Sequence, residues 1–291
     1  MKTATGVPRS IEEGSGPSLG GGNPPRLTHV PASPPPLPLA TLLRALTAEP
    51  GRPRLTWYGP SDERVELSGH VLDNWVTKTT NLLVEEFSAG PGTRVLLDLP
   101  VHWRTVVWAF ATWRSGSCVV LPGALDPGDC DVVVTGRPEA YPGSGAEVVA
   151  VALGALDRRF RGDLPPGALD AAAGVMTYGD VLTWLPEADI RREALHLSDR
   201  AVPHADLLPW AADRAPVSAG ARLLLTSQTD LTGMLAAVLS VYAGVGSAVL
   251  CDAEVSARLE ADPERRRRLV ESERVTAHGP GAGTGGGTAS D

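Results

Sequence analysis

Lysine is nearly absent from this sequence: Lys2 and Lys78 are the only two among 291 residues. Lys2 lies in a stretch rich in Pro, Gly and Ser, and Lys78 falls on the polar face of an early predicted helix. We therefore expect neither ammonium group to reach a bound phosphate or acyl group. We therefore do not expect this chain to catalyse a reaction that depends on a lysine side chain.

An excess of positive charge is missing as well. The formal net charge is -8, from 26 Lys and Arg against 34 Asp and Glu. Proteins that bind nucleic acids need clustered cations to neutralise phosphates, so we expect no nucleic-acid partner. The three cysteines, Cys118, Cys130 and Cys251, form no C-x-x-C pair, and two of them fall in or at the end of apolar strand-like runs, where small core residues are expected. This usage fits a reducing cytoplasm.

No segment has the pattern of a secretory signal or a membrane anchor. Residues 1–36 are rich in Pro, Gly and Ser and lack an apolar signal segment, and residues 277–291 are mostly Gly, Ala, Thr and Ser, so both ends are predicted to be disordered tails. The run from Leu231 to Cys251 carries no charge, but Gly244 and Gly246 divide it into a short helix and a strand. We therefore expect no membrane partner.

What the sequence does contain is an alternation of strand-like and helix-like segments between residues 37 and 276. A hydrophobic content of 43% is enough for a substantial core. Strands are predicted at 54–58, 64–67, 95–99, 117–121, 131–135, 147–151, 221–226 and 247–251, and helices at 37–46, 68–88 and 231–243. This pattern predicts an α/β domain with a layered, mostly parallel sheet flanked by helices.

The middle of the chain is less regular. Residues 157–216 show no sustained period, and helices are predicted there only at 178–184 and 205–212.

The stretch from Thr93 to Pro122 reads as strand, turn, helix, glycine stop and second strand, which is a βαβ unit. With the helical segment before it, which contains Asn81-Leu82-Leu83, it resembles the opening of acyl-CoA synthetases and of the wider adenylate-forming ligase superfamily. Residues 37–137 are similar to that family's first subdomain, and 220–252 resemble its later strand, helix and strand. The resemblance implies the fold of the N-terminal subdomains of these enzymes.

The family's phosphate loop, of the form T-S-G-T-T-G-x-P-K-G, is missing from this sequence. In the family its backbone amides and lysine hold the ATP phosphates. The stretch from Thr226 to Gly233 is a poor substitute, because Gln228 replaces a glycine, Asp230 adds a carboxylate and no P-K-G follows. The family's aromatic-Gly-x-Thr-Glu and Thr-Gly-Asp motifs and its C-terminal lysine are not found either. The chain is therefore interpreted as a truncated, degenerate member of the superfamily.

The turn between the predicted strand 221–226 and helix 231–243 is the first candidate ligand site. Thr226, Ser227, Thr229 and Asp230 lie in it, at the edge of the sheet where α/β proteins bind ligands. Backbone amides at a helix start attract anions, but Asp230 can satisfy them as the N-cap residue. Two interpretations stay open: a self-capped turn, or a phosphate site formed by the Ser and Thr side chains.

Other candidate residues carry weaker signals. His102 follows another strand and is a second candidate ligand residue, against a structural cap or a solvent contact. His196 and His204, eight residues apart, are predicted to lie in a solvated loop rather than a metal site. Arg265 to Arg268 have acidic neighbours, which predicts a capped helix of mixed charge that begins near Pro263.

The leading hypothesis is a non-catalytic homologue that binds a small carboxylate or acyl ligand, a protein partner or a second copy of itself. The alternative is an ATP-dependent carboxylate-adenylating ligase, active alone or completed by a separately encoded partner. A third hypothesis is a nucleotide-binding fold with unrelated chemistry. No catalytic residue and no metal ligand is assigned, the cofactor is left open, and tight binding of ATP with Mg²⁺ is not expected.

Overall fold

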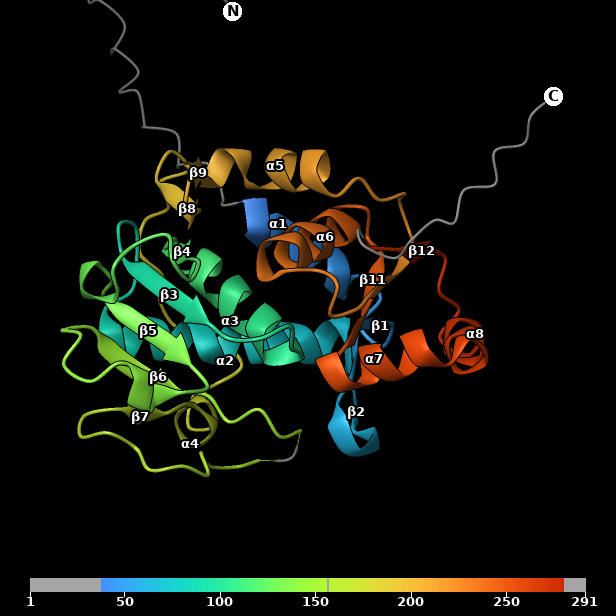
Figure 1. Ribbon diagram of the computed structural model, residues 1–291. Helices are drawn as coiled ribbons and strands as arrows, with labels where there is room; N and C mark the ends of the chain where they lie inside the picture. The colour runs from blue at the N-terminus through green and yellow to red at the C-terminus, as the bar shows by residue number, and fades with distance from the viewer. Residues whose placement is uncertain (1–37, 156, 280–291) are drawn as a thin grey trace, which may run out of the picture. The chain divides into compact units, whose positions relative to one another are not determined.

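The computed structural model describes residues 38–155 and 157–279. Strands of two mostly parallel sheets alternate with helices along these residues (Figure 1), which confirms the predicted α/β class. The predicted tail over 1–36 lies outside the described residues, as does the C-terminal tail from residue 280 onward.

One sheet has five strands and joins distant parts of the chain. In spatial order they are β12 (Ala277–His278), β10 (Arg222–Leu225), β11 (Ser247–Cys251), β1 (Pro53–Tyr58) and β2 (Arg64–Ser68). The first four run parallel, and β1 forms the predicted antiparallel hairpin with β2. β1 pairs with β11, so that Leu55 lies opposite Ala248.

The other sheet has seven strands from one continuous part of the chain. In spatial order they are β7 (Leu169–Asp170), β6 (Glu147–Ala150), β5 (Val132–Thr135), β3 (Arg94–Asp98), β4 (Cys118–Val120), β8 (Glu193–His196) and β9 (Ala201–Pro203). Only β8 and β9 pair antiparallel. The central strands β4 and β5 are buried along their whole length, as expected of parallel strands covered on both faces.

A layer of helices separates the two sheets and forms the main core. It contains α1 (Pro38–Thr47), α2 (Gly69–Phe87), α3 (Trp103–Arg114) and α6 (Leu231–Ala243), and Figure 1 shows α2 and α3 crossing the centre of the molecule. Leu223 and Leu225 point into this core, whereas Leu224 points to the opposite face of its sheet, as the two-residue period of a strand requires. Every residue of α3 from Trp103 to Trp113 is buried, as the tryptophans on several faces predicted.

Two further helices cover the outer face of the five-stranded sheet. They are α7 (Ala253–Ala261) and α8 (Pro263–Ser272), and their apolar side chains pack on Leu224, Val249 and Cys251. α8 begins at the predicted Pro263, and Asp262 caps it by accepting a hydrogen bond from the Arg265 amide at 3.0 Å. α5 (Leu207–Arg214) packs on α6 and confirms the helix predicted near 205–212.

The uncharged run from Leu231 to Cys251 is divided as predicted. α6 ends before Gly244 and β11 starts at Ser247. A Cβ at Gly246 would lie 2.3 Å from the Ala221 carbonyl oxygen, so the turn between α6 and β11 requires a glycine at this position. Among the described helices, none combines the length and the apolar character that crossing a bilayer demands.

Two expectations are wrong at the level of local structure. Residues 178–184 form no helix, because backbone carbonyls of this segment are bound by side chains of α2: Asn81 Nδ2 donates to Gly179 O at 3.1 Å and to Val181 O at 3.0 Å. The C-terminal tail was predicted to begin at residue 277, but Ala277–His278 pair with β10. The Gly279 amide then donates to Leu224 O at 2.9 Å, so these residues belong to the sheet. The short helix α4 (Ala171–Val175) was not predicted.

Candidate functional site

The turn between β10 and α6 is closed by its own residues. Asp230 is the N-cap of α6, and its Oδ1 accepts a hydrogen bond from the Gly233 amide at 2.7 Å. The Thr229 amide donates to the Thr226 carbonyl at 3.1 Å, and both threonine side chains are buried. The carboxylate of Asp230 thus takes the position in which a bound anion would accept from the start of the helix.

The same turn is also fastened to α7. The Ser227 amide donates to Ser256 Oγ at 2.9 Å, and the Gln228 side chain donates to Glu260 Oε1 at 2.8 Å. Ser256 Oγ itself donates to the Cys251 carbonyl at 3.3 Å. Of the predicted site residues in this turn, Ser227 and Asp230 are exposed, and the Ser227 amide and Asp230 Oδ1 already hold hydrogen bonds within the protein.

His102 lies at the start of α3 and is buried, with 3% of its surface exposed. Its Nδ1 accepts a hydrogen bond from the Arg104 amide at 3.0 Å, which makes it the N-cap of α3 and assigns the ring proton to Nε2. Burial, together with the positive charge of Arg104, lowers the pKa of His102 to about 3, so the ring is neutral. The predicted cap is correct, and the alternative of a solvent contact is wrong.

Ring contacts tie His102 to β1. Its imidazole meets the Trp57 ring edge-on, with 4.3 Å between ring centroids, and Trp103 lies 5.8 Å away on the other side. Its Nε2 is buried, and a backbone hydrogen bond with Leu153 partly offsets the lowering of the His102 pKa. β1 and β10 flank β11, so His102 and the Thr226–Asp230 turn both border the carboxyl edge of the five-stranded sheet.

Arg104 is the residue that the sequence interpretation missed. Its surface is 8% exposed, and its guanidinium lies over the Trp103 ring at 4.4 Å and near the Trp75 ring at 5.7 Å. Within 38–155 and 157–279 the guanidinium makes no ion pair and no hydrogen bond, and Nε is buried. Burial lowers the pKa of Arg104 to about 10, with the charge of Asp157 acting in the opposite direction, so it stays cationic at neutral pH.

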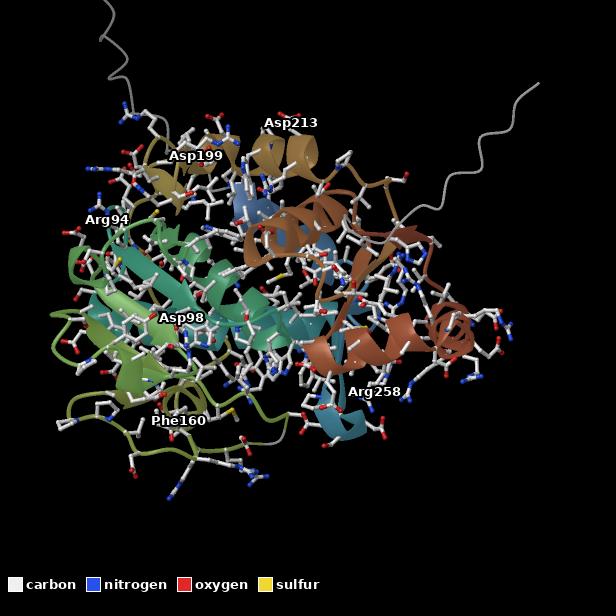
Figure 2. The ribbon with its side chains drawn as sticks, in the orientation of Figure 1. Arg94, Asp98, Phe160, Asp199, Asp213 and Arg258 are labelled. Carbon is white, nitrogen blue, oxygen red and sulfur yellow. The ribbon has the colours of Figure 1, made fainter. Side chains whose placement is uncertain are left out.

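The seven-stranded sheet has a polar cluster at its carboxyl edge, formed by Asp98, Thr135, Arg137 and Tyr141. Figure 2 labels Asp98 at the end of β3. Its carboxylate accepts from Thr135 Oγ1 at 3.0 Å and pairs with Arg137 at 3.1 Å. Burial and a hydrogen bond with Asp98 raise the pKa of Tyr141 to about 12. The charges in this cluster are matched within it.

A second, larger polar cluster, which we call the Glu273 network, joins the five-stranded sheet to the end of α8. Glu273 is 7% exposed and binds Tyr58, Arg64 and Arg222. Arg222 also donates to Ser247 Oγ at 3.2 Å and to Thr56 Oγ1 at 3.0 Å. A cavity of about 510 Å³ opens beside this network.

Side chains that could serve phosphate or metal chemistry are engaged elsewhere. Lys78 Nζ donates to the Tyr178 carbonyl at 2.6 Å, while Lys2 lies outside the described residues. His204 is buried and His196 belongs to β8, so the predicted solvated loop is wrong. β8 and β9 are only three or four residues long, which is too short to give residues 157–216 a recognisable hydrophobic period. No group of three His, Cys, Asp or Glu side chains within the described ranges is arranged to hold a metal ion.

Solved structures with the same fold are acyl-CoA-forming enzymes. The Brucella canis acyl-CoA synthetase superposes with a TM-score of 0.60 at 16% identity, over 82% of this chain and 49% of that chain. The anthranilate CoA ligase AuaEII, solved in complex with anthranoyl-AMP, superposes with a TM-score of 0.56 at 15% identity, over 73% of this chain and 44% of that chain. This chain therefore spans about half the length of these enzymes, and at such identities the likeness shows the fold alone.

Sequence comparison identifies a relative that this chain matches over nearly the whole length of that relative. No family model matches the sequence. A TIGR03089 family protein of Mycobacterium tuberculosis (strain ATCC 25618 / H37Rv) is 32% identical over 238 residues, which cover 79% of this chain and 93% of that protein. Identity at this level, over most of both chains, shows that this protein belongs to the TIGR03089 family.

Proposed function

We propose that this protein is a non-catalytic, shortened homologue of the acyl-CoA synthetases that acts by binding a small carboxylate or acyl ligand. The observation that carries the proposal is the closed turn before α6. Asp230 occupies the helix start, and Ser256 and Glu260 bind the neighbouring groups of the turn. A triphosphate would have to displace a carboxylate and break hydrogen bonds, and Lys78, the lysine within 38–155 and 157–279, is bound to the Tyr178 carbonyl instead.

The chemistry of adenylation also argues for a binding role. Transfer of the adenylyl group of ATP to a carboxylate, with release of pyrophosphate, requires donors and cations already positioned around the phosphates, because the transition state spreads charge over their oxygens. Lys78 Nζ is instead bound by the Tyr178 backbone carbonyl. The solved neighbour with anthranoyl-AMP shows that this fold accommodates an acyl group. A homologue can keep the acyl-binding function of its fold while losing the nucleotide reaction.

Pyrophosphate exchange tests the proposal directly. The full chain is incubated with ATP, Mg²⁺ and a panel of carboxylic acids, and we expect exchange no higher than without protein. In parallel, calorimetry with ATP and Mg²⁺ compares wild type with Ser227→Ala, and we expect weak binding that the substitution does not change. Exchange that depends on a carboxylate, or tight ATP binding that Ser227→Ala abolishes, would contradict the non-catalytic assignment.

A second candidate function is an adenylating ligase completed by another polypeptide. The chain matches only 49% and 44% of the solved enzymes, so about half of each has no counterpart here. A partner that supplies a phosphate loop and a lysine would restore the missing cations. Exchange activity that appears only when a second purified protein is added would favour this function over the binding role.

We place the protein in a reducing compartment such as the cytoplasm. Cys118, Cys130 and Cys251 are free thiols buried in the core. Burial, the largest effect, raises the pKa of both Cys118 and Cys251 to about 12, so these thiols stay protonated and unreactive. This usage fits small core residues rather than disulfide staples.

A further inference from the structure

Four side chains at the start of α3 form one contact cluster, which we call the α3 donor cluster: Trp57, His102, Trp103 and Arg104. Trp57 comes from β1, and the other three are consecutive in the chain. The His102 ring lies 4.3 Å from the Trp57 ring and 5.8 Å from the Trp103 ring, and the Arg104 guanidinium lies 4.4 Å from the Trp103 ring. The cluster is therefore continuous from the carboxyl end of β1 to the first turn of α3.

Every polar group that the side chains leave unused in this cluster is a hydrogen-bond donor. Trp57 Nε1, Trp103 Nε1 and Arg104 Nε are buried and have no hydrogen-bond partner among the described residues. An indole and a guanidinium can only donate. The proton of His102 is on Nε2, because its Nδ1 accepts from the Arg104 amide, and the Leu153 backbone acts on this ring as a hydrogen-bond partner. Buried donors normally have partners, so the three in this cluster call for an acceptor.

The cluster also holds a positive charge that the protein does not neutralise. Stacking on Trp103 and Trp75 covers the face of the Arg104 guanidinium but leaves its N–H groups unused. Asp157 is the carboxylate whose charge acts on Arg104, yet its own ion pair is with Arg161. A buried cation without a counter-ion is unfavourable unless the protein uses it.

We propose that the α3 donor cluster is the binding site for a small monocarboxylate, with Arg104 as its counter-ion. A carboxylate is planar, accepts hydrogen bonds only and matches the fork of a guanidinium. One negative charge balances the one unpaired cation, whereas a phosphate dianion would exceed it. Trp75, which is only partly buried and meets Trp103 edge-on, provides aromatic surface for the apolar part of such an acid. The inference deepens the proposed binding function by naming its ligand class and residues.

Thermal melting of the full chain with simple acids tests this site, and no ATP is added. The probes are sodium benzoate and sodium octanoate, with benzamide as a neutral probe of the same shape as benzoate and inorganic phosphate as a different anion. We expect one or both carboxylates to raise the melting temperature of wild type, and benzamide and phosphate to leave it unchanged. Calorimetry with the more effective acid then gives its affinity.

Variants at position 104 identify the counter-ion. Arg104→Met keeps an apolar stem and should abolish the carboxylate-dependent shift while melting above wild type without ligand, because the unpaired charge is gone. Arg104→Lys keeps the charge but loses the fork, and should weaken binding at least tenfold. Arg158→Met is the matched control, since Arg158 is exposed in the nearby loop, and it should behave as wild type.

Four results would overturn the proposal. They are no shift of wild type with either carboxylate, a shift with phosphate but not with the acids, an undiminished shift in Arg104→Met, or loss of cooperative melting in that variant, which would assign Arg104 to the fold itself. Full affinity in Arg104→Lys would also exclude recognition by the guanidinium fork. Because ATP is absent, these results are independent of the pyrophosphate exchange assay. A failure of either proposal can thus be recognised by itself.

Discussion

Arg104 at the start of α3 and Arg222 at the start of β10 are both largely withdrawn from solvent, but only one of them is neutralised by the protein. Arg222 pairs with Glu273 and donates to two hydroxyl groups. Arg104 stacks on aromatic rings, and no carboxylate of the described residues lies within hydrogen-bonding reach of it. The fold can supply a counter-ion to a buried arginine, so the missing one at Arg104 is a property of that site and not of the protein.

The difference also separates two roles of buried charge. In the Glu273 network, Tyr58, Arg64 and Arg222 converge on one carboxylate and join β1, β2 and β10 to the end of α8. Such a network fixes structure, since each group leaves its partners unsatisfied when it is removed. In the α3 donor cluster, removal of the charge leaves no carboxylate behind. The Glu273 network stabilises the contacts between these elements, whereas the α3 donor cluster is suited to bind a ligand.

Replacement of Glu273 would convert the paired site into an unpaired one and has the largest expected effect. Glu273→Gln keeps the shape but leaves Arg222 without its charge partner, so we expect a loss of ~3 kcal/mol in the free energy of unfolding. Urea denaturation measures it. Glu66→Gln is the control, because Glu66 binds Arg64 on an exposed surface and should cost only ~0.5 kcal/mol. Equal effects of the two variants would mean that the network is no stronger than a surface ion pair.

The pH dependence of the same variant follows from the pKa of Glu273. Burial alone would raise that pKa, but hydrogen bonds from Tyr58, Arg222 and Arg64 outweigh it and hold the pKa below its usual value. A carboxyl group with a lowered folded-state pKa stabilises the protein above its unfolded-state pKa and loses this contribution as the pH falls through the folded value. The stability difference between wild type and Glu273→Gln should therefore be full at neutral pH and shrink below about pH 4.5. A constant difference down to about pH 3 would contradict this sign.

A change at Gly59 should disturb the α3 donor cluster without replacing any of its residues. A Cβ at this position would lie 2.1 Å from the Trp57 ring, so Gly59→Ala must displace the ring that contacts His102. We expect a loss of ~2 kcal/mol in stability from this overpacking and an altered near-ultraviolet circular dichroism spectrum. Gly51→Ala is the matched control, since nothing lies within 4 Å of its Cβ position and its stability should hardly change. An unchanged aromatic signal in Gly59→Ala would show that Trp57 does not depend on this close contact.

In the turn before α6, a carboxylate of the turn itself accepts the hydrogen bond of a backbone amide, so this site differs from both arginine sites. Asp230→Ala removes the acceptor of the Gly233 amide and should cost ~1 kcal/mol of stability, the usual effect of a lost helix cap. Nucleotide affinity should remain weak, because the turn stays bound to α7. Asp163→Ala, at an exposed position, serves as the surface control. A loss no greater than in this control would mean that the cap contributes little.

Sequence periodicity was sufficient for the long elements because each one satisfies its own backbone. α2, α3 and α6 have apolar faces over three or more turns, and the central strands are apolar runs bounded by Gly or Pro. The segment 178–184 was mistaken for a helix because its carbonyls are bound by Asn81 and Lys78, nearly one hundred residues earlier in the chain. No local pattern reports such contacts.

The candidate site was predictable only in part for the same reason. Capping by Asp230 and His102 depends on neighbours within three residues, and both caps follow from residue type and position. Arg104 follows His102 by two residues, yet the sequence does not show that its guanidinium has no ion-pair partner among the described residues. That property depends on where Asp157 and Arg161 lie in space. The available signal was a single cation between tryptophans at the start of an otherwise apolar helix.

The division of strands between the two sheets has a consequence for the order of folding. The seven-stranded sheet is drawn from residues 94–203, so all its strands are synthesised before β10. β1 and β2, although synthesised earlier, must wait for β11, almost two hundred residues later, before their sheet can form. Pairings of such long sequence separation form slowly, because the intervening loop must close first. During synthesis the β1–β2 hairpin is thus an exposed apolar edge, the part of the nascent chain for which a chaperone would be most useful.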